Sequence, residues 1–180
     1  MKGVIFNLLE EIVEAEFGAD TWDALLEAAE ASGVYTSIGS YDDGEMMGLV
    51  AAASAQLNLT QDEVLRWFGS KALPRLAERF DQFFAPHTTS RDLLLTLNNV
   101  IHPEVVKLYP GAYTPTFHFS SEDHDTLMME YSSNRQLCSL AEGFVQGTLT
   151  FYKEKADIEH PLCVHRGDAS CTFRIKFKSD

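Results

Sequence analysis

The sequence predicts an α+β domain in which helices come first and a mostly antiparallel sheet follows. Apolar residues recur at helical spacing through the first half of the chain, from Val4 to about Tyr109. After Pro115 the pattern changes to short, alternating runs that are typical of strands. Helices followed by strands, with one long helix inserted among the strands, are characteristic of the α+β class.

Three helices are expected in the first 60 residues. The first stops at Gly18, and its apolar positions have helical spacing: Val4, Ile5, Leu8, Leu9, Ile12 and Val13. The second begins at Trp22 and ends near Gly33. The third begins at about Asp42 and continues through the apolar run GEMMGLVAAASAQL.

Two further helices are expected before the strands. The fourth opens with Thr60, and Glu63 three residues later completes the capping-box spacing, in which each side chain bonds the other residue's backbone N–H. The fifth is expected to begin with Ser90 as its N-cap and to end at Tyr109, where Tyr-Pro-Gly breaks the helix. Pro103 lies inside it, where the missing N–H should bend the backbone.

The last third of the chain is expected to form strands around one long helix. The runs TFHFSS (116–121) and TLMMEYSS (126–133) predict two strands, and CTFRIKFKSD (171–180) alternates as a terminal strand. Between them, QLCSLAEGFVQGTLTFYKEKA (136–156) returns to helical spacing. We found no repeat or linker, so residues 1–180 are expected to form a single domain.

Charge and composition exclude several classes of partner. The chain has 27 acidic and 14 basic residues, a formal net charge of −13, whereas binding to nucleic acid or to an anionic membrane surface needs a basic face. No apolar stretch approaches the ~20 residues that span a bilayer, and no secretory signal is evident. We therefore expect a cytoplasmic protein whose three cysteines are kept reduced.

The cysteines and one histidine suggest a metal site. Cys138 lies on the predicted long helix, while His160 and Cys163 form an H-x-x-C motif that a seven-residue polar loop separates from Cys171. Zn²⁺ prefers four tetrahedral nitrogen and sulfur ligands, and these residues supply a closed Cys₃His set. His165 is a competing ligand, and three unrelated buried thiols remain the alternative interpretation.

A second constellation combines a histidine with a Y-x-S-x-R motif. His102 lies beside apolar residues in the fifth helix, and on its own it is better explained as a core histidine. Tyr131 and Ser133 point to the same side of a strand, and Arg135 follows where the chain turns into a helix. Two hydroxyls and a guanidinium can bind one or two carboxylates. An ordinary strand end with a surface arginine is the simpler alternative.

Three segments together resemble one family. MKGVIFN at the start, NNVIHPEVVKLYPGA in the middle and YSSNR later resemble the haem nitric oxide/oxygen-binding (H-NOX) family in the same order and at similar spacing. The cysteine and histidine set resembles a zinc site in a subset of the bacterial stand-alone, NO-sensing members. The resemblance implies haem b buried between a helical distal lobe (about 1–60) and a proximal lobe (about 61–180).

The resemblance also implies a role for each matched residue. His102 becomes the axial ligand of the haem iron, and neutral imidazole is a common haem ligand. The propionates are then bound by Tyr131, Ser133 and Arg135. The residues that press on the porphyrin and distort it are then Ile5 and Pro115.

Ligand selectivity depends on position 140. Oxygen-binding members of the family carry a tyrosine five residues after the motif arginine, and it donates a hydrogen bond to O₂. This chain has Leu140 there. Its expected neighbours are apolar: Ile5, Leu9 and Phe144. We therefore expect NO and CO to bind but not O₂, with Tyr109 and Tyr113 left open as other donors.

The resemblance implies a gas sensor and not an enzyme. NO is expected to loosen the bond between His102 and iron, which frees the helix that carries the histidine. The signal would pass to a separate protein, which the family suggests is a histidine kinase or a cyclic-di-GMP enzyme.

A different class of protein remains as the alternative. It is a haem-free, zinc-stabilised domain that binds a small hydrophobic ligand, because the related vinyl-reductase-like ligand domains use a similar frame with a cysteine-rich metal site. A Soret band and a pyridine haemochrome test distinguish this domain from a haem protein.

Overall fold

The computed structural model describes residues 1–178 and has the α+β architecture that the sequence predicts. The first four helices are α1 (Gly3–Phe17), α2 (Ala19–Ala29), α3 (Asp43–Leu57) and α4 (Gln61–Arg79). Four shorter helical segments follow: α5 (Asp81–Phe84), α6 (Ser90–Leu95), the π-helical turn η1 (Leu97–Ile101) and α7 (His102–Leu108). The remaining elements are β1 (Thr116–Ser121), β2 (Thr126–Ser132), α8 (Cys138–Tyr152), β3 (Ala156–Leu162), the short helix η2 (Val164–Arg166) and β4 (Cys171–Phe177).

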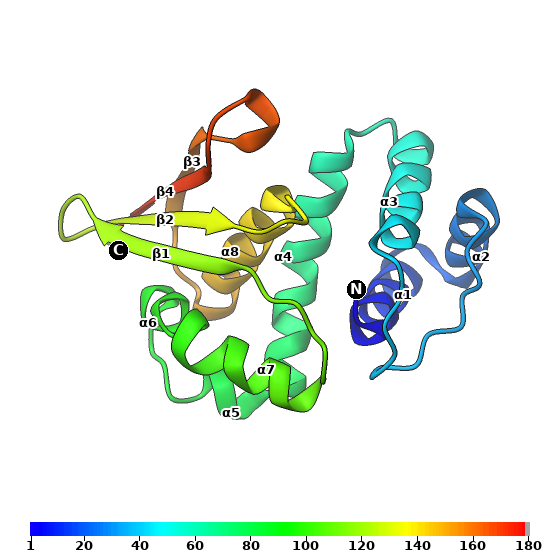
Figure 1. Ribbon diagram of the computed structural model, residues 1–180, viewed down its shortest axis with the longest axis horizontal. Coiled ribbons are helices and arrows are strands. Elements are labelled where there is room, and N and C mark those ends of the chain that lie inside the picture. Colours follow the sequence, from blue (N-terminus) through cyan, green and yellow to red (C-terminus); the bar gives the residue numbers. More distant parts are fainter. Residues whose placement is uncertain (179–180) are drawn as a thin grey trace.

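Helices α1 to α3 form a group on one side of α4 (Figure 1). The first helix ends where predicted, since Gly18 follows it with φ of 90°, a conformation that L side chains rarely adopt. The capping box at the start of α4 is also present, with the Thr60 hydroxyl accepting from the Glu63 N–H and the Glu63 carboxylate accepting from the Thr60 N–H. These local signals therefore set the helix ends that arrange the group.

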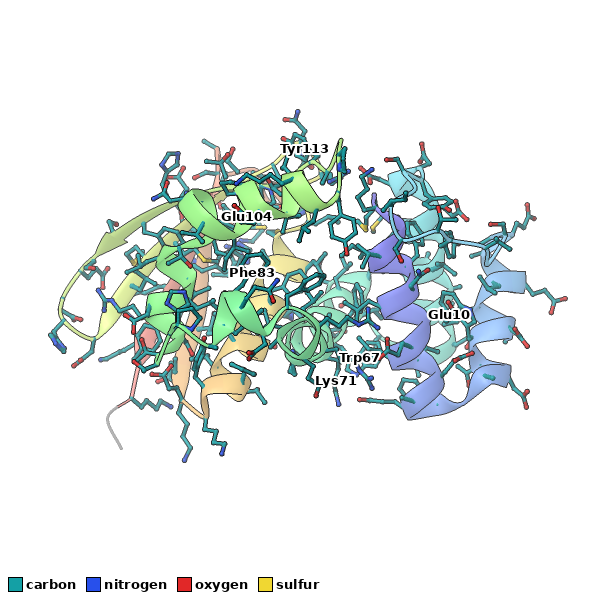
Figure 2. The ribbon with its side chains drawn as sticks, turned by 90° about the horizontal axis from the view of Figure 1, so that it is seen from below. Glu10, Trp67, Lys71, Phe83, Glu104 and Tyr113 are labelled. Atoms are coloured by element: carbon teal, nitrogen blue, oxygen red, sulfur yellow. The ribbon has the colours of Figure 1, made fainter. Side chains whose placement is uncertain are left out.

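The sheet lies on the other side of α4, with α8 between them (Figures 1 and 2). Its strand order is β1-β2-β4-β3, and every pairing is antiparallel. One face of α8 packs on the sheet through Cys138, Ala141, Val145 and Leu149. The opposite face crosses α4 very closely, because a Cβ added at Gly143 would lie 2.2 Å from the Arg66 carbonyl oxygen. Glycine at this crossing is what allows α4 and α8 to approach.

The segment predicted as one helix from Ser90 to Tyr109 is broken into α6, η1 and α7. Thr89, rather than Ser90, is the N-cap, and its hydroxyl accepts from the Asp92 N–H at 3.1 Å. Pro103 lies in the first turn of α7, where backbone N–H groups have no intrahelical partner, so proline costs no hydrogen bond there. The departure from regular α-helix is the π-helical turn before Pro103, and the bend expected at this proline stays a prediction. The short helix α5 was not foreseen.

A second difference concerns the strand β3, which the sequence did not predict. The long helix begins at Cys138 and ends at Tyr152, with Lys153 in the left-handed conformation, and β3 follows from Ala156. This strand is at the sheet edge and contains Pro161, and its register shifts between Glu159 and Leu162. An edge strand tolerates proline and charged residues, because one of its sides is unpaired. These residues interrupt the alternating apolar pattern by which a strand is recognised in the sequence.

The apolar core is divided into two main clusters. One joins α1 to α3 with the first half of α4, through Val64, Leu65, Phe68 and Ala72. The other lies between α8 and the sheet. Because α4 contributes to the first cluster and packs on α8, the division at about residue 60 remains a prediction. None of the helices within residues 1–178 combines the length and apolarity that a membrane crossing needs.

Candidate functional site: an apolar cavity and a cysteine-histidine cluster

A cavity of about 600 Å³ lies between the helical group and the sheet. Its wall includes residues of α1, α4 to α8, β1 and β2 and is largely apolar. Small-molecule and cofactor sites have volumes of roughly 300–1,000 Å³ and a few polar groups among apolar ones. The structure brings every residue matched to a haem role to this one cavity: Ile5, His102, Pro115, Tyr131, Ser133, Arg135 and Leu140.

His102 begins α7 and contributes an imidazole to the cavity wall. Burial lowers the pKa of the ring to about 4, although the backbone of Pro115 opposes this shift. The imidazole is therefore neutral near pH 7, which is the form that binds a metal. Its Nδ1 atom is buried and lacks a hydrogen-bond partner among residues 1–178. A buried and neutral imidazole suits a metal ligand.

Tyr131 and Ser133 lie at the end of β2, where the chain leaves the sheet. The Tyr131 hydroxyl oxygen accepts from the backbone N–H of Leu137 at 3.0 Å, and the Ser133 hydroxyl oxygen accepts from the backbone N–H of Arg135 at 3.2 Å. Both contacts use the hydroxyl oxygen as acceptor and leave its proton free to donate. Two hydroxyl donors at one side of an apolar cavity suit an anionic group such as a carboxylate.

Arg135 links the two sides of the cavity. Its Nε donates to Asp43 Oδ2 at 2.6 Å and its Nη1 donates to the Tyr113 carbonyl oxygen at 2.8 Å, while the Tyr113 ring lies 5.1 Å from the guanidinium carbon. Asp43 also accepts from the Met1 amino group at 2.7 Å. Burial raises the pKa of Asp43, but the hydrogen bonds from Arg135 and Met1 outweigh burial and hold it below its usual value. An ionised Asp43 thus anchors Arg135 to α3.

Leu140 occupies the first turn of α8 and is 9% exposed. It packs with the helical-group core and also faces the cavity. Two of its expected neighbours, Ile5 and Phe144, line the cavity, whereas Leu9 is buried in the core and is not among the lining residues. The wall contributed here by α1 and α8 is therefore apolar.

Three tyrosine side chains near the cavity are possible donors. Tyr109 and Tyr113 both line it, and Tyr113 is 48% exposed beside Arg135. Tyr41, which the sequence did not single out, also lines the cavity. Its hydroxyl oxygen already accepts from the Thr36 N–H at 2.7 Å.

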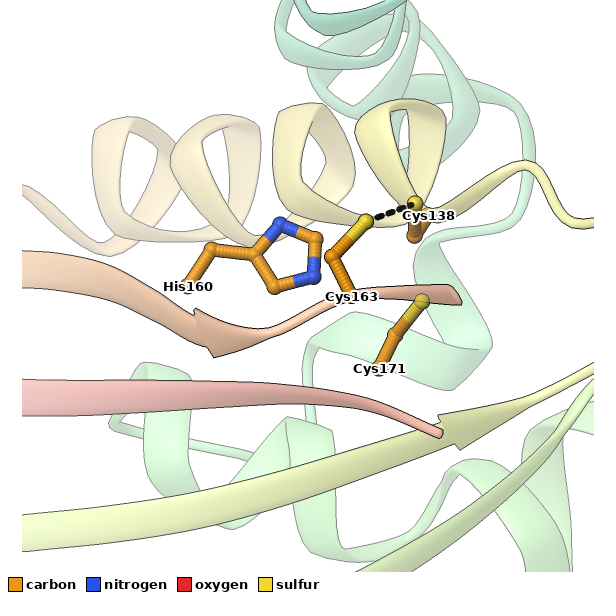
Figure 3. A group of neighbouring side chains, drawn as sticks. All are labelled: Cys138, His160, Cys163 and Cys171. Atoms are coloured by element: carbon orange, nitrogen blue, oxygen red, sulfur yellow. Dashed lines mark hydrogen bonds between the residues drawn. The ribbon is translucent and has the colours of Figure 1, made fainter. Parts of the chain in front are cut away.

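The second candidate site is the cysteine-histidine cluster, which consists of Cys138, His160, Cys163 and Cys171 (Figure 3). Cys138 begins α8, His160 is on β3, Cys163 follows that strand, and Cys171 begins β4. Their ligand atoms all lie within 4.8 Å of one another, and the Cys138 and Cys163 sulfurs are 3.7 Å apart. The unpredicted strand β3 is what carries the histidine to this position.

The donor set of this cluster fits a metal ion. Burial, together with the neighbouring thiols, raises the pKa of Cys138. Because the thiols are therefore hard to ionise on their own, three thiolates would form here only beside a cation that they bind. The buried Nε2 atom of His160 lacks a hydrogen-bond partner in the described part of the chain, and Figure 3 shows this edge of the ring turned toward Cys163. His165 lies elsewhere, with its Nε2 atom 2.7 Å from the Gln136 carbonyl oxygen. The cluster could therefore hold a metal with Cys₃His ligation.

Two residues near these sites were not singled out from the sequence. Asp43 is 92 positions from Arg135, and an acidic residue at a helix start is ordinarily explained by helix capping. Glu142, one turn after Cys138, places a carboxylate oxygen 3.9 Å from His160 Nδ1. Only the helical spacing between Cys138 and Glu142 could have indicated that the carboxylate faces the cluster.

The cavity, with its buried imidazole at one wall and its hydroxyl and guanidinium groups at another, has the features of a haem-binding sensor domain. The chain matches the haem-NO-binding family over residues 2–160, and it therefore belongs to that family.

Solved structures of H-NOX proteins have the same fold. The Shewanella oneidensis protein in the Fe(II)NO state is 32% identical, with a TM-score of 0.93 over 99% of this chain and 100% of that one. An H-NOX domain from the same organism in the Fe(II)CO state is also 32% identical, with a TM-score of 0.90 over 100% of both chains. The unliganded Fe(II) protein from K. algicida is 28% identical, with a TM-score of 0.89 over 100% of this chain and 98% of that one.

A curated relative is much longer than this chain. Soluble guanylate cyclase 89Db of Drosophila melanogaster is 24% identical over 139 residues, which are 75% of this chain but only 20% of the relative. The likeness therefore concerns one part of the cyclase, and its name does not extend to this chain.

Proposed function

We propose that this protein is a haem-based sensor that binds NO and CO, but not O₂, and signals to a separate protein. The observation that carries the proposal is the single cavity that brings together His102, the Y-x-S-x-R residues and Leu140. Family membership and relatives solved with NO and with CO support the choice of ligand class. Ferrous haem supplies an open coordination position that binds a diatomic gas.

Each matched residue has a task in this proposal. His102 holds the iron, and the hydroxyls of Tyr131 and Ser133, with Arg135, bind the propionates. Ile5 and Pro115 constrain the macrocycle. Leu140 keeps the gas-binding side free of a hydrogen-bond donor.

Selectivity against O₂ follows from the chemistry at Leu140. Bound O₂ takes on more negative charge than bound NO or CO, so it gains more from a donor. Replacing Leu140 by tyrosine should strengthen O₂ binding, because a hydrogen bond to a charged acceptor contributes roughly 1.5–3 kcal/mol, about one to two decades in affinity. The absorption spectra of the reduced protein alone, with NO, with CO and in air measure this change.

Leu140→Phe is the matched control, since it adds the ring without the hydroxyl. The unmodified protein and Leu140→Phe should give no stable O₂ spectrum in air, while both bind NO and CO. A stable O₂ spectrum from the unmodified protein would contradict the role of Leu140. Tyr41→Phe would then test whether the Tyr41 hydroxyl is the donor, since Tyr41 lines the same cavity.

Haem retention tests the propionate residues. Arg135→Ala should speed haem loss more than Ser133→Ala, because charge-assisted hydrogen bonds are roughly twice as strong as neutral ones. Haem transfer to excess apomyoglobin measures both rates. Asp43→Asn is the control for the link between Arg135 and α3, because it removes the carboxylate partner while leaving the guanidinium in place. Equal rates for Arg135→Ala and Ser133→Ala would count against this assignment.

We further propose that the cysteine-histidine cluster holds structural Zn²⁺. A closed set of four protein ligands leaves no position for water or substrate, and we therefore assign no catalytic role to the metal. The cluster joins the start of α8 to β3 and β4, and α8 also carries Leu140. Zinc therefore stabilises the part of the fold that supports one wall of the cavity.

The output of the sensor is proposed to pass through α7. His102 is its first residue, so a displacement of the imidazole moves the start of this helix. The family resemblance suggests a histidine kinase or a cyclic-di-GMP enzyme as the receiver. Measuring kinase autophosphorylation with the unliganded and NO-bound sensor tests the first of these receivers.

A further inference from the structure

The side chain of Asn98 is bonded to the backbone of β1 shortly before His102. Its amide nitrogen donates to the Phe117 carbonyl oxygen, and its carbonyl oxygen accepts from the Phe117 N–H at 3.1 Å. Asn98 belongs to the π-helical turn η1, which leads directly into α7. One amide group therefore pairs with both polar backbone groups of a single strand residue, as a neighbouring strand would.

The position of Phe117 makes this contact relevant to the cavity. β1 is one of the two edge strands of the sheet, and Phe117 is opposite Tyr131 on β2. Since the Phe117 N–H and carbonyl face Asn98, the Phe117–Tyr131 pair does not share ladder hydrogen bonds, and side chains in such pairs lie close together. The Phe117 ring centroid is 5.7 Å from the Tyr131 ring and 5.8 Å from the His102 ring.

The π-helical turn provides a second, independent observation. Such turns are rare and frequently occur at functional sites. Here the turn ends at Ile101, immediately before His102. Leu97 and Ile101, at its two ends, pack against the apolar clusters, while Asn99 and Val100 are exposed. Within residues 1–178, the two hydrogen bonds of Asn98 are the polar side-chain contacts that connect this turn to the sheet.

We infer that Asn98 is a positioning residue that holds His102 in its resting place against the sheet. Its two hydrogen bonds determine how readily the imidazole moves away when a gas binds. The inference rests on the proposed function, since His102 has a resting and a displaced position only if it holds haem. Phe117 contributes to the same restraint, because its ring is close to both His102 and the propionate residue Tyr131.

Rapid mixing of the reduced, haem-loaded protein with NO tests this role. The absorbance change as His102 leaves the iron should be about tenfold faster in Asn98→Ala, because breaking each hydrogen bond as the imidazole moves away adds to the barrier and slows the rate by a factor of roughly 2 to 12. Asn98→Asp keeps an acceptor for the Phe117 N–H but sets a carboxylate oxygen against the Phe117 carbonyl oxygen, so its rate should also exceed that of the parent. Asn99→Ala is the matched control, since Asn99 is exposed in the same turn and does not line the cavity.

Hydrogen exchange provides a readout that does not depend on the gas. The Phe117 N–H should exchange faster in Asn98→Ala than in the parent or in Asn99→Ala, even before NO is added. Unchanged rates of His102 departure in Asn98→Ala, in a parent that responds to NO, would overturn the role of Asn98 alone. A parent protein that takes up no haem would overturn the proposed function as well.

Discussion

Replacing His102 by alanine is expected to yield protein that lacks haem or holds it only when imidazole is supplied. In the proposed site this residue makes the strong bond between the chain and iron, whereas the remaining contacts are packing and propionate hydrogen bonds. Losing a coordinate bond costs more than the roughly 1.4 kcal/mol that changes affinity tenfold, so haem content should fall by more than about tenfold. The Soret band, the pyridine haemochrome and iron analysis measure this loss.

His118→Ala is the matched control, because His118 is exposed on β1 and does not line the cavity. It should keep its haem. Circular dichroism of His102→Ala separates loss of the cofactor from loss of the fold. Normal haem content and an unaltered reduced spectrum in a folded His102→Ala protein would exclude this residue as the axial ligand.

Replacing a cysteine of the cysteine-histidine cluster is expected to have the second large effect, on zinc content and on the melting temperature. The fresh protein should contain about one zinc per chain, and Cys138→Ala, Cys163→Ala and Cys171→Ala should each lose most of it. The melting temperature should fall in each variant, because structural zinc contributes roughly 10–16 kcal/mol of apparent binding free energy in small zinc domains, and that energy stabilises the fold. Oxidation of the thiolates should release the metal from the parent protein.

His165→Ala is the control that distinguishes the two candidate histidines. The His165 ring is engaged with the Gln136 carbonyl outside the cluster, so this variant should retain zinc, while His160→Ala should lose it. A fresh protein without zinc, in which all three thiols react freely with a thiol reagent, would rule out the zinc site.

Much of the fold follows from local patterns in the sequence. The α+β class, the end of α1 at Gly18 and the capping box at Thr60 were all predicted and are confirmed. Each of these features depends on residues that are close together in the chain, so its signal does not require knowledge of the tertiary structure. The strand β3 and the division of the segment around His102 into α6, η1 and α7 were not predicted, because the edge position of β3 and the bonds between Asn98 and Phe117 arise only once the sheet has formed.

The sequence by itself determined the chemistry of the candidate sites. It contains a histidine before a proline, a Y-x-S-x-R motif and a Cys₃His set, and the family resemblance that these residues support is confirmed by the haem-NO-binding match. The roles of the individual residues remain proposals. The sequence also shows directly that position 140 is leucine and not tyrosine, and the proposal that O₂ is excluded depends on this residue.

Only the tertiary structure decided which of these residues share a space and what restrains them. It separates His160 from His165 as members of the cluster, ties Arg135 to Asp43 and places Asn98 against β1. These contacts join residues 19 to 92 positions apart. Sequence patterns report the spacing within one helix or strand, whereas such pairs depend on how helices and strands pack together, which neither residue of the pair encodes alone.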